Sequence, residues 1–213
     1  GTVAPLAEGC QSVGQLQDGD GNLVVAMGRL PEQADASGAR VGGEFQPNTY
    51  TYSTQINSKV EQLSDGGFVI VWQSYGVDGN GQYAIAGQRY AANGAKAGGE
   101  FVVNSTNGWS AEYPSITLRE DGALVVVWRG QGGQAIEQTI IDDFVEDTTP
   151  AGVDDSDNVN LPISGSQDSP EVTALADGGH LVVWMSQGSS NPDTSNYGIY
   201  AQRYDAAGEK VGS

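Results

Sequence analysis

The chain has 213 residues, of which 27 are Asp or Glu and 9 are Lys or Arg, so its formal charge is −18 at pH 7. This excess of carboxylates argues against binding to nucleic-acid phosphates or to an anionic membrane surface, because both need clustered Lys and Arg. With 38% apolar residues and 31 glycines, the composition permits a globular core and excludes a collagen, a coiled coil and a wholly disordered chain. The single cysteine, Cys10, excludes an internal disulfide and an all-cysteine metal site.

A repeat runs through the whole chain. Trp72, Trp128 and Trp184 are spaced 56 residues apart, and each ends an apolar, β-branched run that follows an Asp-Gly turn. Another part of the unit also recurs, since the segment 83–90 is repeated with few changes at 197–204. A fixed period of this length indicates a repeat architecture.

Each unit is predicted to contain four strands and no helix, because no segment keeps a helical period. In the second unit the first strand is centred on Val60 and Leu63, and the turn Asp65-Gly66-Gly67 supplies positions of positive φ. The continuous apolar run Phe68–Trp72 predicts a second strand that is covered on both faces. The remaining elements, in chain order, are the third strand Tyr83–Tyr90, the Asn93-Gly94 turn and the fourth strand Phe101–Asn104.

The predicted fold is all-β, with four four-stranded repeats in one domain. The favoured architecture is a small four-bladed β-propeller closed by the N-terminal strand. The expected segments are the closing strand 1–6 and the four units 7–48, 49–104, 105–164 and 165–213. Unit one is 11 residues short, and the third strand of unit three is reduced to Gln134–Glu137. A β-sandwich or a partial propeller completed by another chain therefore remains an alternative.

The second unit resembles a known repeat. Its segments are Asp-Gly-Gly-Phe-Val-Ile-Val-Trp-Gln-Ser at 65–74, Asp-Gly-Asn-Gly at 78–81, Gly-Gln-Arg-Tyr at 87–90 and Gly-Gly-Glu-Phe-Val-Val-Asn at 98–104. This pattern is similar to a repeat of about 50–56 residues in large bacterial secreted or surface proteins, many of which also carry haemolysin-type calcium-binding repeats. The resemblance covers units two and four and part of unit three. It implies an extracellular or cell-surface location and a role in adhesion, and it carries over no catalytic residue.

Three acidic loops are the candidate sites for a cation, and calcium is the predicted cofactor. Oxygen ligands at alternate positions, as in the first of these loops, are typical of the start of a calcium loop. Asp-Gly and Asn-Gly are also what hairpin turns require without any metal, so a purely structural turn remains the alternative for each loop. The candidate ligands are Asp18, Asp20, Asn22, Asp78, Asn80, Asp154, Asp155 and Asp157.

Aromatic residues divide into two groups. The three repeated tryptophans end buried strands and are predicted to pack in the core rather than against a sugar ring. His180, the single histidine, aligns with Phe68 at the head of the second strand and is predicted to be structural. The candidate ligand-binding aromatics lie in loops between units and are Trp109, Tyr113, Tyr50 and Tyr52.

These features predict a non-enzymatic, extracellular or cell-surface binding and adhesion module whose loops are supported by calcium. The sequence has no nucleophile elbow, metalloprotease helix or phosphate loop. The expected partner is a surface protein or carbohydrate, with no nucleic acid and no membrane insertion. One alternative is a carbohydrate-active enzyme on a propeller scaffold, which needs two carboxylates about 5–10 Å apart. The other is a structural subunit that assembles with other chains through the irregular units.

Overall fold

The computed structural model describes residues 45–104, 108–142, 157–160, 165–187 and 197–212, together with two short strands, β1 (Gln15–Gln17) and β2 (Leu23–Val25). This described part is all-β apart from one 3-10 turn, η1 (Gln131–Gly133). It contains no helix that is long and apolar enough to cross a membrane. The predicted all-β class is therefore confirmed.

Three four-stranded antiparallel sheets follow one another along the chain, and in each the strand order is that of the sequence. We name them by the unit that supplies them. Sheet two contains β3 (Gln55–Gln62), β4 (Phe68–Tyr75), β5 (Tyr83–Tyr90) and β6 (Lys96–Val102). Sheet three contains β7 (Glu112–Leu118), β8 (Leu124–Gly130), β9 (Ala135–Ile141) and β10 (Asp157–Asn158). Sheet four contains β11 (Gln167–Ala174), β12 (His180–Ser186), β13 (Gly198–Tyr204) and β14 (Lys210–Val211).

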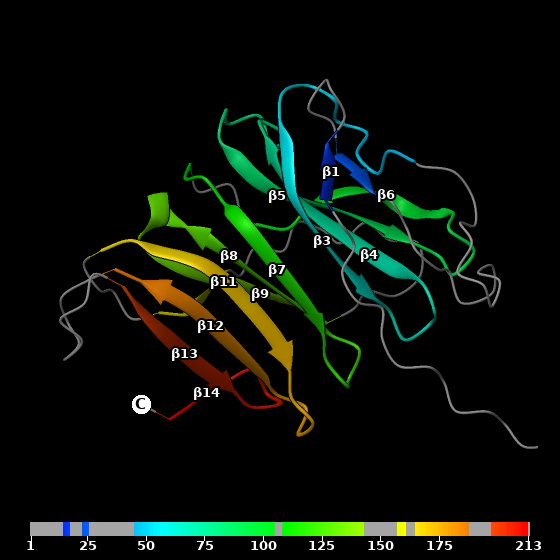
Figure 1. The fold of residues 1–213 in the computed structure, drawn as a ribbon. Helices are drawn as coiled ribbons and strands as arrows, with labels where there is room; N and C mark the ends of the chain where they lie inside the picture. Colours follow the sequence, from blue (N-terminus) through cyan, green and yellow to red (C-terminus); the bar gives the residue numbers. More distant parts are fainter. Residues whose placement is uncertain are drawn as a thin grey trace, which may run out of the picture.

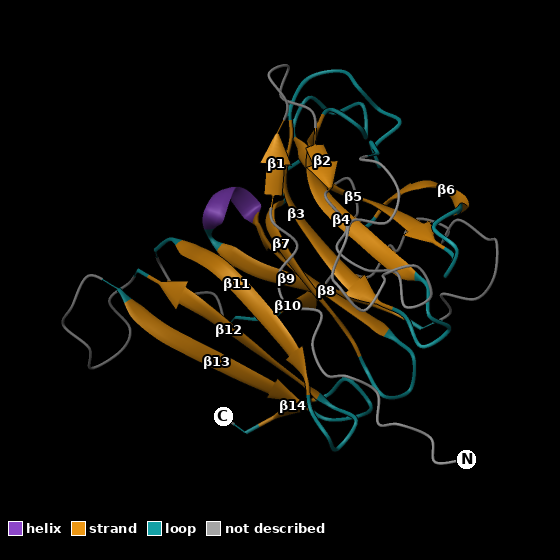
Figure 2. Cartoon of the chain, turned by 45° about the vertical axis from the view of Figure 1, so that its right-hand side comes forward, coloured by secondary structure: helices purple, strands orange, loops and turns teal. Residues whose placement is uncertain are grey.

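The first strand of each sheet is its inner strand. Figure 1 shows β3, β7 and β11 side by side and running in the same direction, and the contacts of β7 with β3 and with β11 agree. In sheet four the strands β12, β13 and β14 follow one another away from β11, as the second view also shows (Figure 2). Three sheets in this propeller-like arrangement do not fit the two layers of a β-sandwich. Most of unit one, including the closing strand 1–6, lies outside the described residues, so the four-bladed ring stays a prediction.

The core fills the spaces between neighbouring sheets. One cluster joins Val69, Val71 and Ile85 of sheet two to Trp128 and other apolar side chains of sheet three. A second cluster joins sheets three and four and contains Trp184. Trp72 is buried on the opposite face of sheet two. All three repeated tryptophans are buried, so their predicted core position is confirmed.

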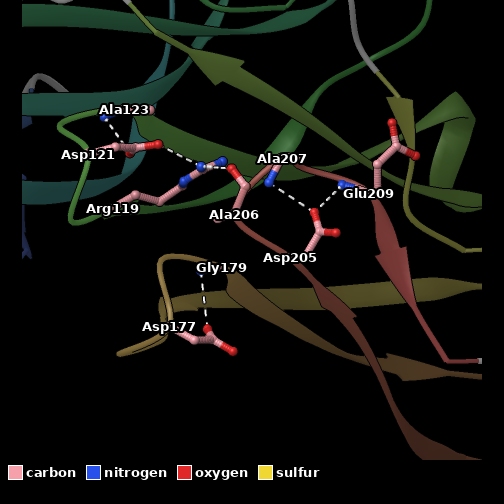
Figure 3. A network of polar contacts seen from close by, with 9 residues as sticks. All are labelled: Arg119, Asp121, Ala123, Asp177, Gly179, Asp205, Ala206, Ala207 and Glu209. Carbon is pink, nitrogen blue, oxygen red and sulfur yellow. Dashed lines mark hydrogen bonds and ion pairs between the residues drawn. The ribbon is translucent and has the colours of Figure 1, made fainter.

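Unit three keeps its third strand, contrary to the sequence-based expectation. Strand β9 pairs along its whole length with β8, because ladder hydrogen bonds use the backbone and do not need the missing Gln-Arg-Tyr sequence. In sheets two and four the arginine of that sequence pairs with the aspartate of a hairpin turn, as Arg89 does with Asp65. In sheet three Ile140 stands at this position. Here Arg119 pairs with Asp121 at 2.6 Å and also donates to the carbonyl oxygen of Ala206 in sheet four (Figure 3).

His180 is a core residue. Its side chain is fully buried, and its Nε2 atom lies 3.1 Å from Oε1 of Gln138. The ring stacks on Tyr204 with 4.5 Å between ring centroids, just as Phe68 stacks on Tyr90 at 4.7 Å in sheet two. Burial, with a smaller contribution from the positive charge of Arg119, lowers the pKa of His180 to about 4. The predicted structural role is therefore confirmed.

This low pKa predicts that stability falls as the medium becomes acidic. Above pH 6.5 the imidazole is neutral in both states, so its contribution to stability is complete. Between pH 6.5 and about 4 the unfolded chain binds a proton that the folded chain does not, which favours unfolding. We expect a His180→Phe variant to lose about 2 kcal/mol less free energy of unfolding than the parent between pH 7 and about 4.5. Urea denaturation at the two pH values measures the free energy of unfolding of both proteins. An equal decrease in the two proteins would show that a group other than His180 is responsible.

Candidate functional site

Each inner strand has a β-bulge at the same place in the repeat. The register of the ladder shifts between Ile56 and Lys59, between Glu112 and Ser115, and between Asp168 and Glu171. The bulges contain Asn57, Tyr113 and Ser169, whose φ angles are 54°, 54° and 49°. Residues other than glycine rarely adopt positive φ, and backbone strain of this kind is concentrated at functional sites. Three strained residues on three adjacent strands therefore mark a candidate site.

The three bulges meet at a pocket of about 370 Å³, which we call the axial pocket. It lies toward the end of the sheets where the inner strands begin. Its volume is within the range of about 300–1,000 Å³ that is usual for small-molecule sites. Residues of all three inner strands line it: Asn57, Ser58, Lys59, Tyr113, Pro114, Ser169, Pro170 and Glu171.

A carboxylate links the three inner strands in this pocket. Oε1 of Glu171 lies 2.9 Å from Nζ of Lys59, and Oε2 accepts a hydrogen bond of 2.7 Å from the hydroxyl of Ser115. These three residues occupy the same position in successive units. Glu171 is largely exposed, with 59% of its side-chain surface accessible. The carboxylate is therefore held in place and is still available to a ligand.

Two more carboxylates lie beside the pocket. Nη1 of Arg129 lies 3.5 Å from Oε2 of Glu112 and 3.7 Å from Oδ2 of Asp168. Because both oxygens are within 3.7 Å of one nitrogen, they are separated by no more than twice that distance. This upper limit overlaps the range of about 5–10 Å between the paired carboxyl groups of glycoside hydrolases. The guanidinium also lies 5.8 Å from the ring of Tyr113, so it connects the carboxylates to the wall of the pocket.

The bulges of sheets two and three are tied to each other by Gln73. Its Oε1 atom accepts a hydrogen bond of 2.9 Å from Nδ2 of Asn57 and one of 3.2 Å from the backbone N–H of Tyr113. Gln73 is buried, and it stands at the position that Arg129 occupies in the next unit. The strained backbone of the pocket is thus supported by a polar side chain beneath it.

The predicted ligand-binding aromatics take different positions. Tyr113 lines the axial pocket with 42% of its surface exposed. Trp109 is 58% exposed and lies against Gly132 in the turn η1. Tyr52 is exposed and Tyr50 is partly buried, both in the segment before β3. Their role in binding stays a prediction.

The predicted calcium ligands are only partly described. In the loop between β4 and β5, Asp78 accepts hydrogen bonds of 3.0 and 3.2 Å from the backbone and side-chain nitrogens of Asn80, as a turn requires. Asp157 is exposed on β10. In the part of the chain that the structure describes, no group of three His, Cys, Asp or Glu side chains is arranged to hold a metal ion. Calcium binding stays a prediction, since five candidate ligands lie outside the described residues: Asp18, Asp20, Asn22, Asp154 and Asp155.

Apart from Tyr113, the residues around the axial pocket are missing from the sequence-based candidates. A signal for them is present, because they are positions at which the repeat does not repeat. The residue after the bulge is Lys59, Ser115 or Glu171 in units two, three and four. The next residue stays apolar, as Val60, Ile116 or Val172, whereas this position changes its charge from unit to unit. It is therefore free of the packing constraint and available for function.

Comparisons with known proteins find likeness in structure only. No protein family and no curated protein matches the sequence. A protein of unknown function from Dyadobacter fermentans aligns over 91% of this chain and 60% of its own, with a TM-score of 0.58 and 12% identity. A thermostable family-43 glycoside hydrolase aligns over 93% of this chain and 70% of its own, with a TM-score of 0.54 and 16% identity. An alpha-L-arabinofuranosidase from Lactobacillus brevis aligns over 79% and 58%, with a TM-score of 0.51 and 13% identity.

These comparisons correct one prediction. At such low identity the likeness is one of fold, and the chain spans only 58–70% of the lengths of these three proteins. The fold is nevertheless shared with glycoside hydrolases, which contradicts the prediction that the chain is not an enzyme. That prediction depended on missing sequence motifs. Glycoside hydrolysis needs only two suitably spaced carboxylates, which leave no short motif in a sequence.

Proposed function

We propose that the chain is a carbohydrate-active protein that binds a saccharide in the axial pocket and hydrolyses its glycosidic bond. The observation that carries this proposal is the convergence of three strained bulges on one pocket, with Glu171 in its wall and the Glu112–Asp168 pair beside it. The fold shared with a family-43 glycoside hydrolase and an alpha-L-arabinofuranosidase supports the same reaction class.

The groups present suit the chemistry of that reaction. Hydrolysis of a glycosidic bond needs one carboxylic acid to protonate the leaving oxygen and one carboxylate to act as base or nucleophile. Glu171 can contact the sugar directly, and Glu112 and Asp168 supply the second group. Arg129 is a positioning residue whose Nη1 atom faces both of these carboxylates. Amides and hydroxyls that line the pocket, such as those of Asn57 and Ser169, offer hydrogen bonds to sugar hydroxyls.

A Glu171→Gln variant is expected to lose most of the activity, because the amide keeps the shape of the side chain but cannot exchange a proton. The expected decrease in kcat is about 10²–10⁴-fold, the usual contribution of a general acid or base. Release of reducing sugar from a panel that includes arabinan, xylan, galactan and mannan measures it. Glu112→Gln and Asp168→Asn are expected to show which of the two acts as the second group.

The matched control is Glu209→Gln, which removes the same charge from an exposed turn far from the pocket. It is expected to leave kcat unchanged. If no polysaccharide of the panel is bound or cleaved by the parent, the proposed function is wrong. If saccharides are bound and none is cleaved, the hydrolytic part is wrong and the binding part stands.

We also propose that the four units form a small β-propeller around this pocket. The support is the shared position of the three inner strands and the contact of β1 and β2, two short strands of unit one, with β3. The extracellular or surface location and the calcium-supported loops stay predictions from the sequence resemblance.

A further inference from the structure

Exposed aromatic side chains gather at one end of the sheets. Because strands alternate in direction, the beginnings of β3, β7 and β13 and the end of β4 lie at the same end of the molecule. This is also the end toward which the axial pocket lies. Five aromatic side chains at this end have between 39% and 80% of their surface exposed: Tyr52, Tyr75, Trp109, Tyr113 and Tyr197. We call the four outside the pocket, without Tyr113, the aromatic rim.

Among the described residues, the opposite end of the sheets carries polar turns in place of exposed aromatic side chains. It carries the hairpin turns, where Asp121 and Asp205 accept hydrogen bonds from backbone N–H groups and Arg119 joins two of the turns (Figure 3). In the part of the chain that the structure describes, no strongly exposed aromatic side chain lies at that end. The aromatic rim is therefore a property of one end and does not simply follow from the composition.

Two members of the rim are held by packing while their surfaces face solvent. Tyr75 contacts Tyr83 edge to face, with 5.2 Å between ring centroids. Trp109 lies against the turn η1, and the neighbouring Ser110 donates a hydrogen bond of 2.9 Å to Gln82 in the loop between β4 and β5. Rings that are already positioned lose little conformational freedom when they bind. Gathered exposed apolar groups of this kind mark an interaction surface.

The charge of the protein and the size of the pocket indicate which class of ligand suits the aromatic rim. A net charge of −18 disfavours a nucleic acid, whose bases would otherwise suit exposed rings. A saccharide has apolar C–H faces that pack on aromatic rings and hydroxyl groups that remain hydrated. The axial pocket, at about 370 Å³, lies near the small end of the range for ligand sites, so a long saccharide must extend out of it across the rim.

We infer that the aromatic rim binds the parts of a polysaccharide chain that extend beyond the axial pocket, so the substrate is a polymer rather than a free mono- or disaccharide. This inference rests on the proposed function and adds the length of the substrate to it. Trp109 and Tyr52 are the most exposed members that flank the pocket-lining strands β7 and β3. They are the residues whose removal best tests the inference.

The test measures affinity against chain length. Arabinan, xylan, galactan, mannan and their oligosaccharides from disaccharide to octasaccharide are titrated calorimetrically into the parent, Trp109→Ala, Tyr52→Ala and the double variant. We expect affinity to rise with chain length in the parent. Each single variant is expected to lose about fivefold in affinity for the polymer and nothing for the disaccharide, because a stacked ring contributes a modest free energy. Val211→Ala, which shortens an exposed apolar side chain on β14 at the opposite end, is the control and is expected to bind as the parent does.

The possible failures are distinguishable. If the disaccharide binds as tightly as the polymer, or if the double variant binds the polymer as the parent does, the inference is wrong and the proposed function stands. If the parent binds neither oligomers nor polymers of any of these four sugars, both are wrong. Unchanged polysaccharide binding, together with loss of self-association by the rim variants in light scattering, would assign the rim to a second copy of the chain.

Discussion

A Trp128→Ala variant is expected to lose about 3–5 kcal/mol of free energy of unfolding, the range found for removal of a buried aromatic side chain. Trp128 is fully buried in the cluster that joins sheets two and three, so its loss leaves a cavity between two sheets. Its Nε1 atom also donates a hydrogen bond of 2.8 Å to Glu137, which is only 5% exposed. The variant therefore leaves a buried carboxylate without this donor. Since domains are usually stable by about 5–15 kcal/mol, much of the stability would be lost.

Two further variants separate the contributions. Trp128→Phe keeps most of the ring volume but not the N–H group. Its free energy of unfolding is therefore expected to lie between that of the parent and that of Trp128→Ala. Trp109→Ala makes the same chemical change at a side chain that is 58% exposed, and is expected to change stability by about 0.5 kcal/mol or less. Urea denaturation followed by far-UV circular dichroism measures all three. Equal midpoints for Trp128→Ala and Trp109→Ala would contradict the packing of sheets two and three described here.

The strands could be predicted from the sequence because the same pattern occurs several times. The predicted third strand of unit two, Tyr83–Tyr90, is the observed β5 residue for residue. The apolar run Phe68–Trp72 is buried at every position, as expected for a strand that is covered on both faces. A short apolar run alone can be a buried strand or part of a buried helix. Repetition removes this ambiguity, because a chance run does not recur at a fixed spacing together with its turn residues.

One repeated polar residue was missed. Asn104 and Asn160 lie 56 residues apart, and the side-chain oxygen of each accepts a hydrogen bond of 2.7 Å from a backbone N–H, that of Ile85 or that of Ile136. Both residues are buried. An asparagine at the end of a strand looks like a turn residue in the sequence, although here it satisfies a backbone donor near the beginning of a neighbouring strand.

Apart from Tyr113, the candidate site was not predicted from the sequence, for two physical reasons. The bulges have Asn57, Tyr113 and Ser169 at positive φ, and no glycine marks these positions. In addition, carboxylates are so numerous in this chain that only their position in space distinguishes them. Glu171 becomes a site residue because Lys59 and Ser115 of two other sheets meet it. That meeting depends on the arrangement of the sheets, which composition and periodicity do not contain.

The second glycine of the Asp-Gly-Gly turns is expected to tolerate no side chain. The sequence predicts positive φ in these turns, and the first glycine has it, with φ of 83° at Gly66 and 84° at Gly178. The second glycine is required for space. A Cβ atom at Gly179 would fall well inside contact distance of the carbonyl oxygen of Tyr204, and one at Gly67 would meet that of Tyr90 in the same way. Because backbone atoms cannot move aside without breaking the ladder, each Gly→Ala variant is expected to cost about 2–3 kcal/mol.

The repeat itself supplies the control for this prediction. In unit three the equivalent residue is Ala123, and the strand β9 that crosses it carries Ile140-Ile141 in place of Arg-Tyr. Ala123→Gly is therefore expected to cost about 1 kcal/mol or less, the usual effect of glycine in place of alanine. Thermal melts of Gly67→Ala, Gly179→Ala and Ala123→Gly compare the three units directly. If Gly179→Ala were as stable as the parent, the close approach of strand β13 to this turn would be refuted. No structural feature would then require glycine at the second position of the turn in units two and four.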